Sequence, residues 1–165
     1  MAKSDSFFIR ARVATNGTTY AETSIDLGAY VDALGKSVLR IHNIAVQYGD
    51  PPFIFPAGSA NENSNVCFQL TTQTQTAMVN ATNKSLISSG NLTMVLDGTL
   101  AYVNTSDSLD VAPQHWTQGY LVGVEQIYLA VDQTADKVDA VSIVLECTVE
   151  TLSQSAAMAL ALSQQ

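Results

Sequence analysis

The stretch YLVGVEQIYLAVDQTADKVDAVSIVLECTVE, positions 120 to 150, constrains the fold more than any other part of the sequence. On both sides of a polar break at 132–139, apolar side chains recur at every second position, and β-branched and aromatic residues are frequent. A period of two residues places alternate side chains on opposite faces of a strand. The pattern therefore predicts two long strands, at 119–131 and 138–150, joined as a hairpin by a polar loop.

The same alternation recurs along the rest of the chain. It predicts further strands at 6–15, 18–25, 37–48, 64–80 and 91–103, and Asp97-Gly98 either separates two short strands in the last range or marks a bulge. Asn16-Gly17 predicts a tight turn after the first strand, and the apolar spacing in 26–35 predicts a short helix or a turn. Long loops rich in Pro, Gly, Asn and Ser are expected at 49–65 and 105–119.

Strands that follow one another without helices between them exclude a parallel α/β sheet. About eight strands with loops gathered at the ends fit an all-β, antiparallel β-sandwich of single jelly-roll type. An immunoglobulin-like sandwich fits much of the same count. No linker or internal repeat divides the sequence, so we expect one domain over 1–165, with a helical or extended tail at 152–165.

The charge distribution argues against direct contact with nucleic acid. Seven Lys and Arg against 15 Asp and Glu give a net charge of −8. Counterion-release binding needs clustered basic residues. Here only Lys3, Arg10 and Arg12 lie close together, and a solvated face of the first strand explains them. Since only 13% of residues are charged, much of the surface must be uncharged and polar, which suits a surface covered by neighbours.

Residue types that support catalysis are sparse. No nucleophile elbow, P-loop or HExxH motif occurs. His42 lies within an apolar strand, where a packed histidine is expected, and His115 lies beside Trp116 in a loop. We therefore expect no enzymatic activity and no cofactor.

Metal binding and secretion are not indicated either. The loop aspartates lack EF-hand spacing, so no metal site is expected at Asp107, Asp110, Asp132, Asp136 or Asp139. Cys67 and Cys147 stand alone in apolar, strand-like runs, which favours buried free thiols over a disulfide. The start MAKSDSFFIR has no apolar h-region, and no run approaches the length of a membrane span.

Several features together resemble the single jelly-roll capsid proteins of tailless icosahedral viruses. They are the long strands, the PPFIFP and APQHW loops, the alternating ending GYLVGVEQIYLAVD…VDAVSIVLECTVETLS and the small-residue tail. The resemblance implies a structural virion protein, made in the host cytoplasm, that assembles with itself and with other capsid proteins into a shell. The acidic balance agrees with shells that enclose an internal lipid membrane, whose capsid protein need not touch the genome.

A shell subunit must place apolar side chains where neighbouring copies cover them. Outside the regular strands, such residues concentrate in three segments, and the expected contact residues are Phe53, Ile54, Phe55, His115, Trp116, Leu152, Met158, Leu160 and Leu162. The alternative is that these segments fold back and cap their own sandwich. A different function, a carbohydrate-binding, lectin-like sandwich, would use Trp116, Tyr120 and loop aspartates on a sugar.

Overall fold

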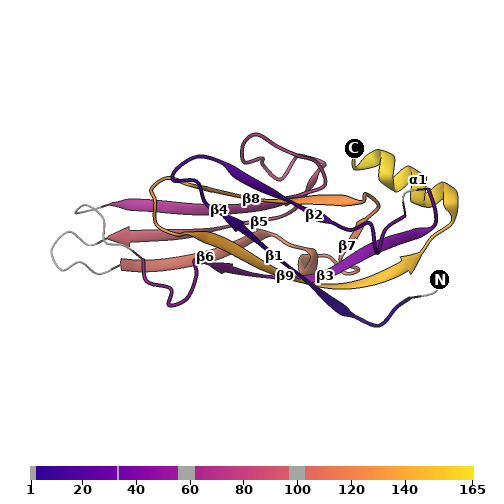
Figure 1. The fold of residues 1–165 in the computed structure, drawn as a ribbon, viewed down its shortest axis with the longest axis horizontal. Helices are drawn as coiled ribbons and strands as arrows, with labels where there is room; N and C mark the ends of the chain where they lie inside the picture. Colours follow the sequence, from indigo (N-terminus) through magenta and orange to yellow (C-terminus); the bar gives the residue numbers. More distant parts are fainter. Residues whose placement is uncertain (1–2, 33, 56–61, 97–102) are drawn as a thin grey trace.

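The structure, a computed structural model, describes residues 3–32, 34–55, 62–96 and 103–165. In these ranges the chain forms two antiparallel β-sheets that face each other, with a short helix at the carboxyl end (Figure 1). The elements are β1 (Phe7–Ala14), β2 (Ala21–Asp26), β3 (Ser37–Tyr48), β4 (Asn63–Thr71), β5 (Leu86–Leu96), β6 (Val103–Val111), η1 (Pro113–His115), β7 (Tyr120–Val122), β8 (Gln126–Gln133), β9 (Ala140–Thr151) and α1 (Gln154–Ser163).

The order of strands is that of a jelly roll. One sheet has the order β1-β9-β3-β7, and the other has the order β2-β8-β4-β5-β6. The chain passes from sheet to sheet between most successive strands, so most neighbours within a sheet are distant in sequence, with β4, β5 and β6 as the exception. Without β6 the fold is eight strands, four in each sheet, as a jelly roll requires. The predicted all-β sandwich is therefore confirmed, with β6 as an additional edge strand.

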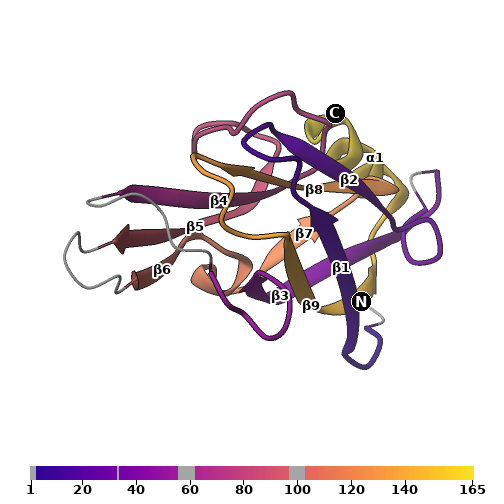
Figure 2. The ribbon, with the colours of Figure 1, turned by 60° about the vertical axis from the view of Figure 1, so that its left-hand side comes forward.

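The predicted hairpin over 119–150 is wrong in its pairing. β8 lies between β2 and β4, whereas β9 lies between β1 and β3 in the other sheet. The polar loop after β8 thus crosses the edge of the sandwich (Figure 2). The predicted strand 119–131 also divides, because β7 pairs with β3 and β8 does not. Alternation defines the faces of a strand but not its partner, and strands of both sheets here have one buried face.

Other predicted boundaries shift for local reasons. The strand expected at 64–80 ends at Thr71, and the segment that follows crosses the outer face of β4. There Gln69 Nε2 donates to the Ala77 carbonyl, and Val79 N donates to Gln69 Oε1. β5 begins at Leu86, earlier than expected, and β6 lies within the predicted loop 105–119. Asp97-Gly98 lies outside the described residues.

Both predicted turns are present. Gly17 has a positive φ of 56° and follows Asn16, as a tight turn requires, but it joins strands of different sheets. In 26–35, Tyr30 N and Val31 N both donate to the Leu27 carbonyl, and this single turn does not continue as a helix.

The core fills the space between the sheets. Its largest fully buried side chain is Phe68, surrounded by Leu, Ile and Val from both sheets. The inward side chains come from the alternating positions of β3, β4, β8 and β9, for example Leu39, Ile41, Leu129 and Leu145. Both long strands of the opening stretch therefore bury a face, as predicted, and the remaining apolar residues must find other positions.

Candidate functional site

The loop after β3 holds apolar side chains at the surface. We call residues 49–55 the Ile54 loop. Ile54 is 79% exposed, and Phe53 is exposed as well, whereas Phe55 is half-buried and packs against the core. Of the three residues predicted here, two are therefore available to a partner and Phe55 contributes to the packing of its own subunit.

The backbone of the Ile54 loop has an unusual conformation. Gly49 has a φ of 85°, and Phe53 has a φ of 60°, which a bulky residue rarely adopts. Such a conformation persists only when the surroundings hold it. Here the Phe53 N–H donates to the Asp50 carbonyl, and Arg12 Nε donates to Asp50 Oδ1 at 3.2 Å. These contacts thus hold the loop in a conformation that directs Ile54 outward.

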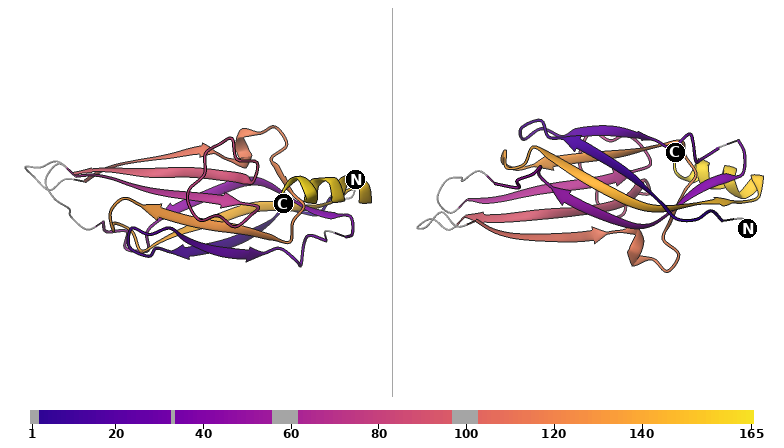
Figure 3. Two further views of the ribbon diagram at one scale, coloured as in Figure 1. Left: turned by 90° about the horizontal axis from the view of Figure 1, so that it is seen from above. Right: turned by 60° about the horizontal axis from the view of Figure 1, so that its bottom comes forward.

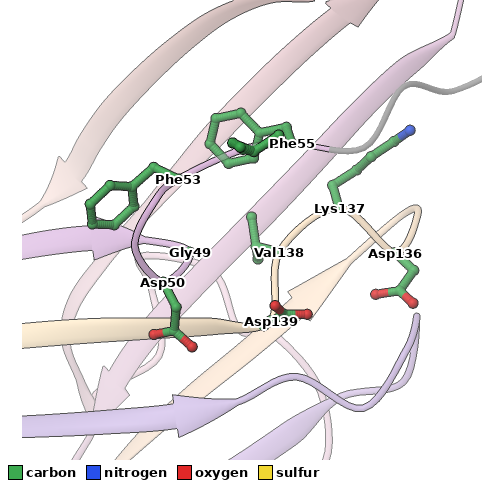
Figure 4. A pocket seen from close by; sticks show the side chains of 9 residues that line it. Gly49, Asp50, Phe53, Phe55, Asp136, Lys137, Val138 and Asp139 are labelled. Carbon is green, nitrogen blue, oxygen red and sulfur yellow. The ribbon is translucent and has the colours of Figure 1, made fainter.

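Carboxylates surround this loop. A hollow of about 260 Å³ lies between the loop and the β8–β9 connection. Figure 4 shows the Phe53 and Phe55 rings on one side of it and the carboxylates of Asp50, Asp136 and Asp139 on the other. The hydrogen bond from Arg12 lowers the pKa of Asp50. This end of the molecule therefore combines a projecting apolar side chain with negative charge.

The carboxyl-terminal tail forms a helix that docks on its own subunit. Ser153 caps α1 by accepting from the Ala156 N–H, and the small side chains of Ala157 and Ala161 are buried. Gly123 leaves room for this contact, since a Cβ there would lie 3.0 Å from Leu160 Cγ. The tail is thus helical, one of the two conformations predicted, and in part it caps its own sandwich.

The last described turn of the tail is anchored by one polar side chain. Gln164 Nε2 donates to the Leu121 carbonyl at 2.7 Å, and Gly123 N donates to Gln164 Oε1 at 2.8 Å. Thr72 Oγ1 donates to the Gln164 carbonyl. Because buried backbone groups need partners, these bonds hold the tail against the segment between β7 and β8.

The docked tail still presents apolar side chains. Met158 and Leu162 are exposed, Leu162 at 68%, whereas Leu152 and Leu160 are half-buried. A helix that buries only its alanines uses one narrow face. Its larger side chains therefore remain available to a partner.

Trp116 lies beside this tail. Gln114 fixes η1 on β3, because its side chain accepts from Ile44 N and donates to the Ile44 carbonyl. Trp116 follows, 53% exposed. Together with Tyr120, Leu121 and Leu160 it lines an open hollow of about 690 Å³, which we call the Trp116 hollow. His115 is exposed but is not among the residues that line it.

The structure therefore gathers the predicted residues at two ends of the sandwich. The tail lies at one end of the sandwich with the Trp116 hollow beside it, and the Ile54 loop follows β3 toward the other end (Figures 1 and 3). β3 connects them. β3 begins directly after Lys36, whose carbonyl accepts a hydrogen bond from Leu152 N at the start of the tail. From there its 12 residues extend about 40 Å to Tyr48.

Sequence reasoning missed some residues of these surfaces. Lys84 lines the Trp116 hollow, although it lies in the segment between two predicted strands, 64–80 and 91–103. Phe8 is also exposed, on the same face of β1 as Arg10 and Arg12. The Arg10 guanidinium lies 5.8 Å from the Phe8 ring centre. Leu34 and Val95 are exposed too, without a sequence signal to distinguish them from core residues.

The groups considered for chemistry are engaged in local contacts. His42 Nε2 lies 2.9 Å from Thr148 Oγ1, and burial, with Lys3 nearby, lowers the pKa of His42. Cys67 and Cys147 are free thiols, as predicted, but Cys67 is only half-buried, and burial raises the pKa of Cys147 to about 12. A thiol with such a pKa is a poor nucleophile at neutral pH.

The loop aspartates lie in two places. Asp136 and Asp139 line the hollow beside the Ile54 loop, whereas Asp110, next to Val111 of the Trp116 hollow, accepts from Asn91 Nδ2 and Ser108 Oγ and does not line that hollow. Across the described ranges, no group of three or more His, Cys, Asp or Glu is arranged to hold a metal ion. None of the helices in the described part of the chain has the length and apolar character needed to cross a membrane.

Comparison with known proteins gives structural likenesses only. No family model matches the chain, and no curated protein matches its sequence. Solved viral capsid proteins have a similar fold. The VP1 protein of an unassembled Washington University polyomavirus pentamer is 8% identical, with 88% of this chain and 93% of that chain covered and a TM-score of 0.44.

Two further solved structures from viruses also resemble this chain. The unassembled VP1 pentamer of Merkel cell polyomavirus is 6% identical, with 90% and 96% of the two chains covered and a TM-score of 0.46. A structure of Desmodium yellow mottle tymovirus is 10% identical, with 89% and 87% covered and a TM-score of 0.35.

Proposed function

We propose that this chain is a structural subunit of a viral shell and that it works by associating with copies of itself. One observation supports this most strongly. Large apolar side chains that a monomer would bury are exposed at both ends of the sandwich, namely Ile54 at one end and Trp116 and Leu162 at the other. Exposed apolar surface of this kind marks sites of association. The jelly-roll sandwich supplies the rigid body that presents them.

The partners follow from the same surfaces. The subunit meets copies of itself, and other shell proteins, through patches that expose large apolar side chains. Direct contact with nucleic acid is not part of the proposal, because four of the seven basic residues are paired with carboxylates inside the subunit. The pairs are Lys3–Glu150, Arg12–Asp50, Arg40–Glu150 and Lys137–Glu62. The protein would act in the virion, and an internal lipid membrane would separate it from the genome.

Site-directed change tests the proposal. Replacing both Ile54 and Trp116 with Ser should weaken assembly without loss of the β-sheet signal in circular dichroism. Loss of an aromatic anchor at an interface reduces binding by about 2 kcal/mol, or roughly 30-fold in affinity. Sedimentation and negative-stain imaging measure the assembled fraction.

Phe8→Ser is the matched control, because Phe8 is an exposed aromatic on the outer face of β1, away from both ends. The control should assemble like the unchanged protein. Equal loss in both variants would mean that exposed apolar surface in general, rather than these two ends, drives association.

A second function has one observation in its favour. Trp116 and Tyr120 line the same hollow, as a sugar-stacking platform requires. The chain would then be a lectin-like binding module. Titration with neutral and acidic sugars, followed by Trp116 fluorescence, tests this, and saturable binding by a monomeric protein would favour it over the shell subunit.

A further inference from the structure

We infer that the Ile54 loop of one copy inserts into the Trp116 hollow of the next, so that subunits join head to tail. This depends on the proposed function and deepens it, because it names the two surfaces that meet and makes a second copy of the chain the occupant of the hollow.

The two surfaces differ in shape. The Ile54 loop projects, with Ile54 79% exposed. The Trp116 hollow is concave, about 690 Å³ in volume, with the apolar side chains of Leu121 and Leu160 beside Trp116. Two loops facing each other would offer Ile54 only the smaller hollow of about 260 Å³ with its carboxylates, and two facing Trp116 hollows would enclose an unfilled space. A projecting surface and a concave surface on one chain favour a heterologous contact.

The two surfaces also differ in charge. Lys84 is the charged residue among the described residues that line the Trp116 hollow. The Ile54 loop contains Asp50, which pairs with Arg12, and beside the loop lie Asp136, Asp139 and Lys137, the last of which pairs with Glu62. Joining the loop to the hollow brings Lys84 toward the two remaining carboxylates, whereas joining two loops brings carboxylates together. Charge complementarity therefore selects the same pairing as shape.

The backbone of the loop supports a role outside its own subunit. Phe53 keeps a φ of 60°, a strained conformation for a phenylalanine. The strain places Ile54 in solvent instead of against the core, where Phe55 already packs. Insertion of Ile54 into a neighbour would bury the side chain that this conformation exposes.

The position of the surfaces allows the contact to repeat. The Ile54 loop follows the last residue of β3, whereas the hollow lies beside β7, which pairs with Leu39–Ile41 in the first half of β3, so a subunit that inserts its loop into one neighbour leaves its own hollow open to another. Such head-to-tail contacts generate a closed ring when a rotation relates successive copies.

Cysteine cross-linking between two differently substituted proteins tests the pairing directly. Both carry Cys67→Ser, which removes a half-buried native thiol, and one also carries Ile54→Cys and the other Ser163→Cys. Ser163 is exposed and lines the hollow. After assembly of the mixture and mild oxidation, a disulfide-linked dimer should form between the two proteins and not within either alone. Ala45→Cys, on the exposed outer face of β3, replaces Ser163→Cys in the control and should give no cross-link.

A charge exchange provides a second measurement. Lys84→Asp and Asp136→Lys should each reduce the affinity of assembly about ten-fold, and the two together in one chain should restore it, because the opposite charges face each other again. Restoration separates a charge contact from a general effect on folding.

The outcomes distinguish the pairing from the proposed function. One contrary outcome is normal particles in which the only cross-link joins two Ile54→Cys proteins, and another is normal particles in which no dimer links position 54 to position 163. Either result overturns the head-to-tail pairing and leaves the proposed shell subunit intact. Absence of any assembly overturns the proposed function. Particles that tolerate both charge variants and bind a sugar in the hollow would assign the hollow to that ligand instead.

Discussion

The tail and the Ile54 loop are attached to the sandwich in different ways. Both are apolar segments outside the strands. The tail is held to its own subunit by the hydrogen bonds of Gln164 and by two buried alanines, whereas the Ile54 loop has a surface ion pair at its base and an unburied Ile54 at its tip. Apolar composition therefore does not determine whether a segment packs within its own subunit. Polar anchors do, and the larger side chains of the tail remain exposed despite its anchors.

The largest expected effect is the loss of folding stability when a core residue is changed, in contrast to a residue of this exposed surface. Leu145→Asp places an unpaired carboxylate in a fully buried position and should destabilise the fold by several kcal/mol, roughly a large share of its total stability. Val124→Asp, also buried but between β7 and β8, should act in the same direction. Urea unfolding measures both.

Ile54→Asp is the matched surface variant. It should leave stability within about 0.5 kcal/mol, because Ile54 has little buried surface to lose. If Ile54→Asp unfolds the protein as Leu145→Asp does, the loop belongs to the core and the comparison of the two regions fails.

The next effect concerns the anchor of the tail. Gln164→Ala leaves Gly123 N and the Leu121 carbonyl without their partner and should destabilise the docked tail by about 1–3 kcal/mol. Hydrogen exchange should then accelerate in α1 and remain slow in β8 and β9. Gln165→Ala, at the exposed neighbouring position, should leave exchange unchanged. Equal exchange in the two variants would mean that the alanines alone dock the helix.

A smaller effect distinguishes two ion pairs, one near each region. Arg40 binds Glu150 through two hydrogen bonds, of 2.6 and 2.8 Å, and this buried pair lies at the end of β9 that leads into the tail. The Arg12–Asp50 pair at the Ile54 loop is more exposed. In each pair the arginine lowers the pKa of the carboxyl group.

The sign of the pH dependence follows. A carboxyl group with a lowered folded pKa binds fewer protons in the native state than in the unfolded state, whose pKa is about 3.9 for Asp and 4.3 for Glu. Its stabilisation is complete above these values and is lost as pH falls through the folded pKa. Salt should screen the contribution of Asp50 more than that of Glu150. Urea midpoints of Asp50→Asn and Glu150→Gln across pH 2–7 at two salt concentrations measure this, and equal salt dependence would contradict the difference in burial.

The smallest effect is expected at the histidines. His42→Gln keeps a side chain that can hydrogen-bond Thr148, and His115→Gln changes an exposed side chain outside the Trp116 hollow. Stability and assembly should both remain close to those of the unchanged protein. Loss of function without loss of fold in His115→Gln would favour a ligand site near Trp116.

The two regions also show what sequence could predict. Strand positions such as β3 and β9 follow from alternation, because burying one face of a strand requires it. Which sheet a strand joins does not follow, since β8 and β9 alternate alike and yet lie in different sheets. The exposure of Ile54 was predictable from its Pro-rich loop. The Trp116 hollow was not, because Lys84, Trp116 and Leu160 meet only once the topology is known.

The central claim is that this sandwich associates with copies of itself through its two ends, and imaging with mass measurement of the unmodified protein over a range of concentrations tests it most directly. We predict that uniform closed particles replace monomers as concentration rises, and that the Ile54→Ser, Trp116→Ser double variant stays monomeric at concentrations where the unmodified protein has assembled. An unmodified protein that remains a single monomeric species at the highest concentration, and is also absent from purified particles, would contradict the claim.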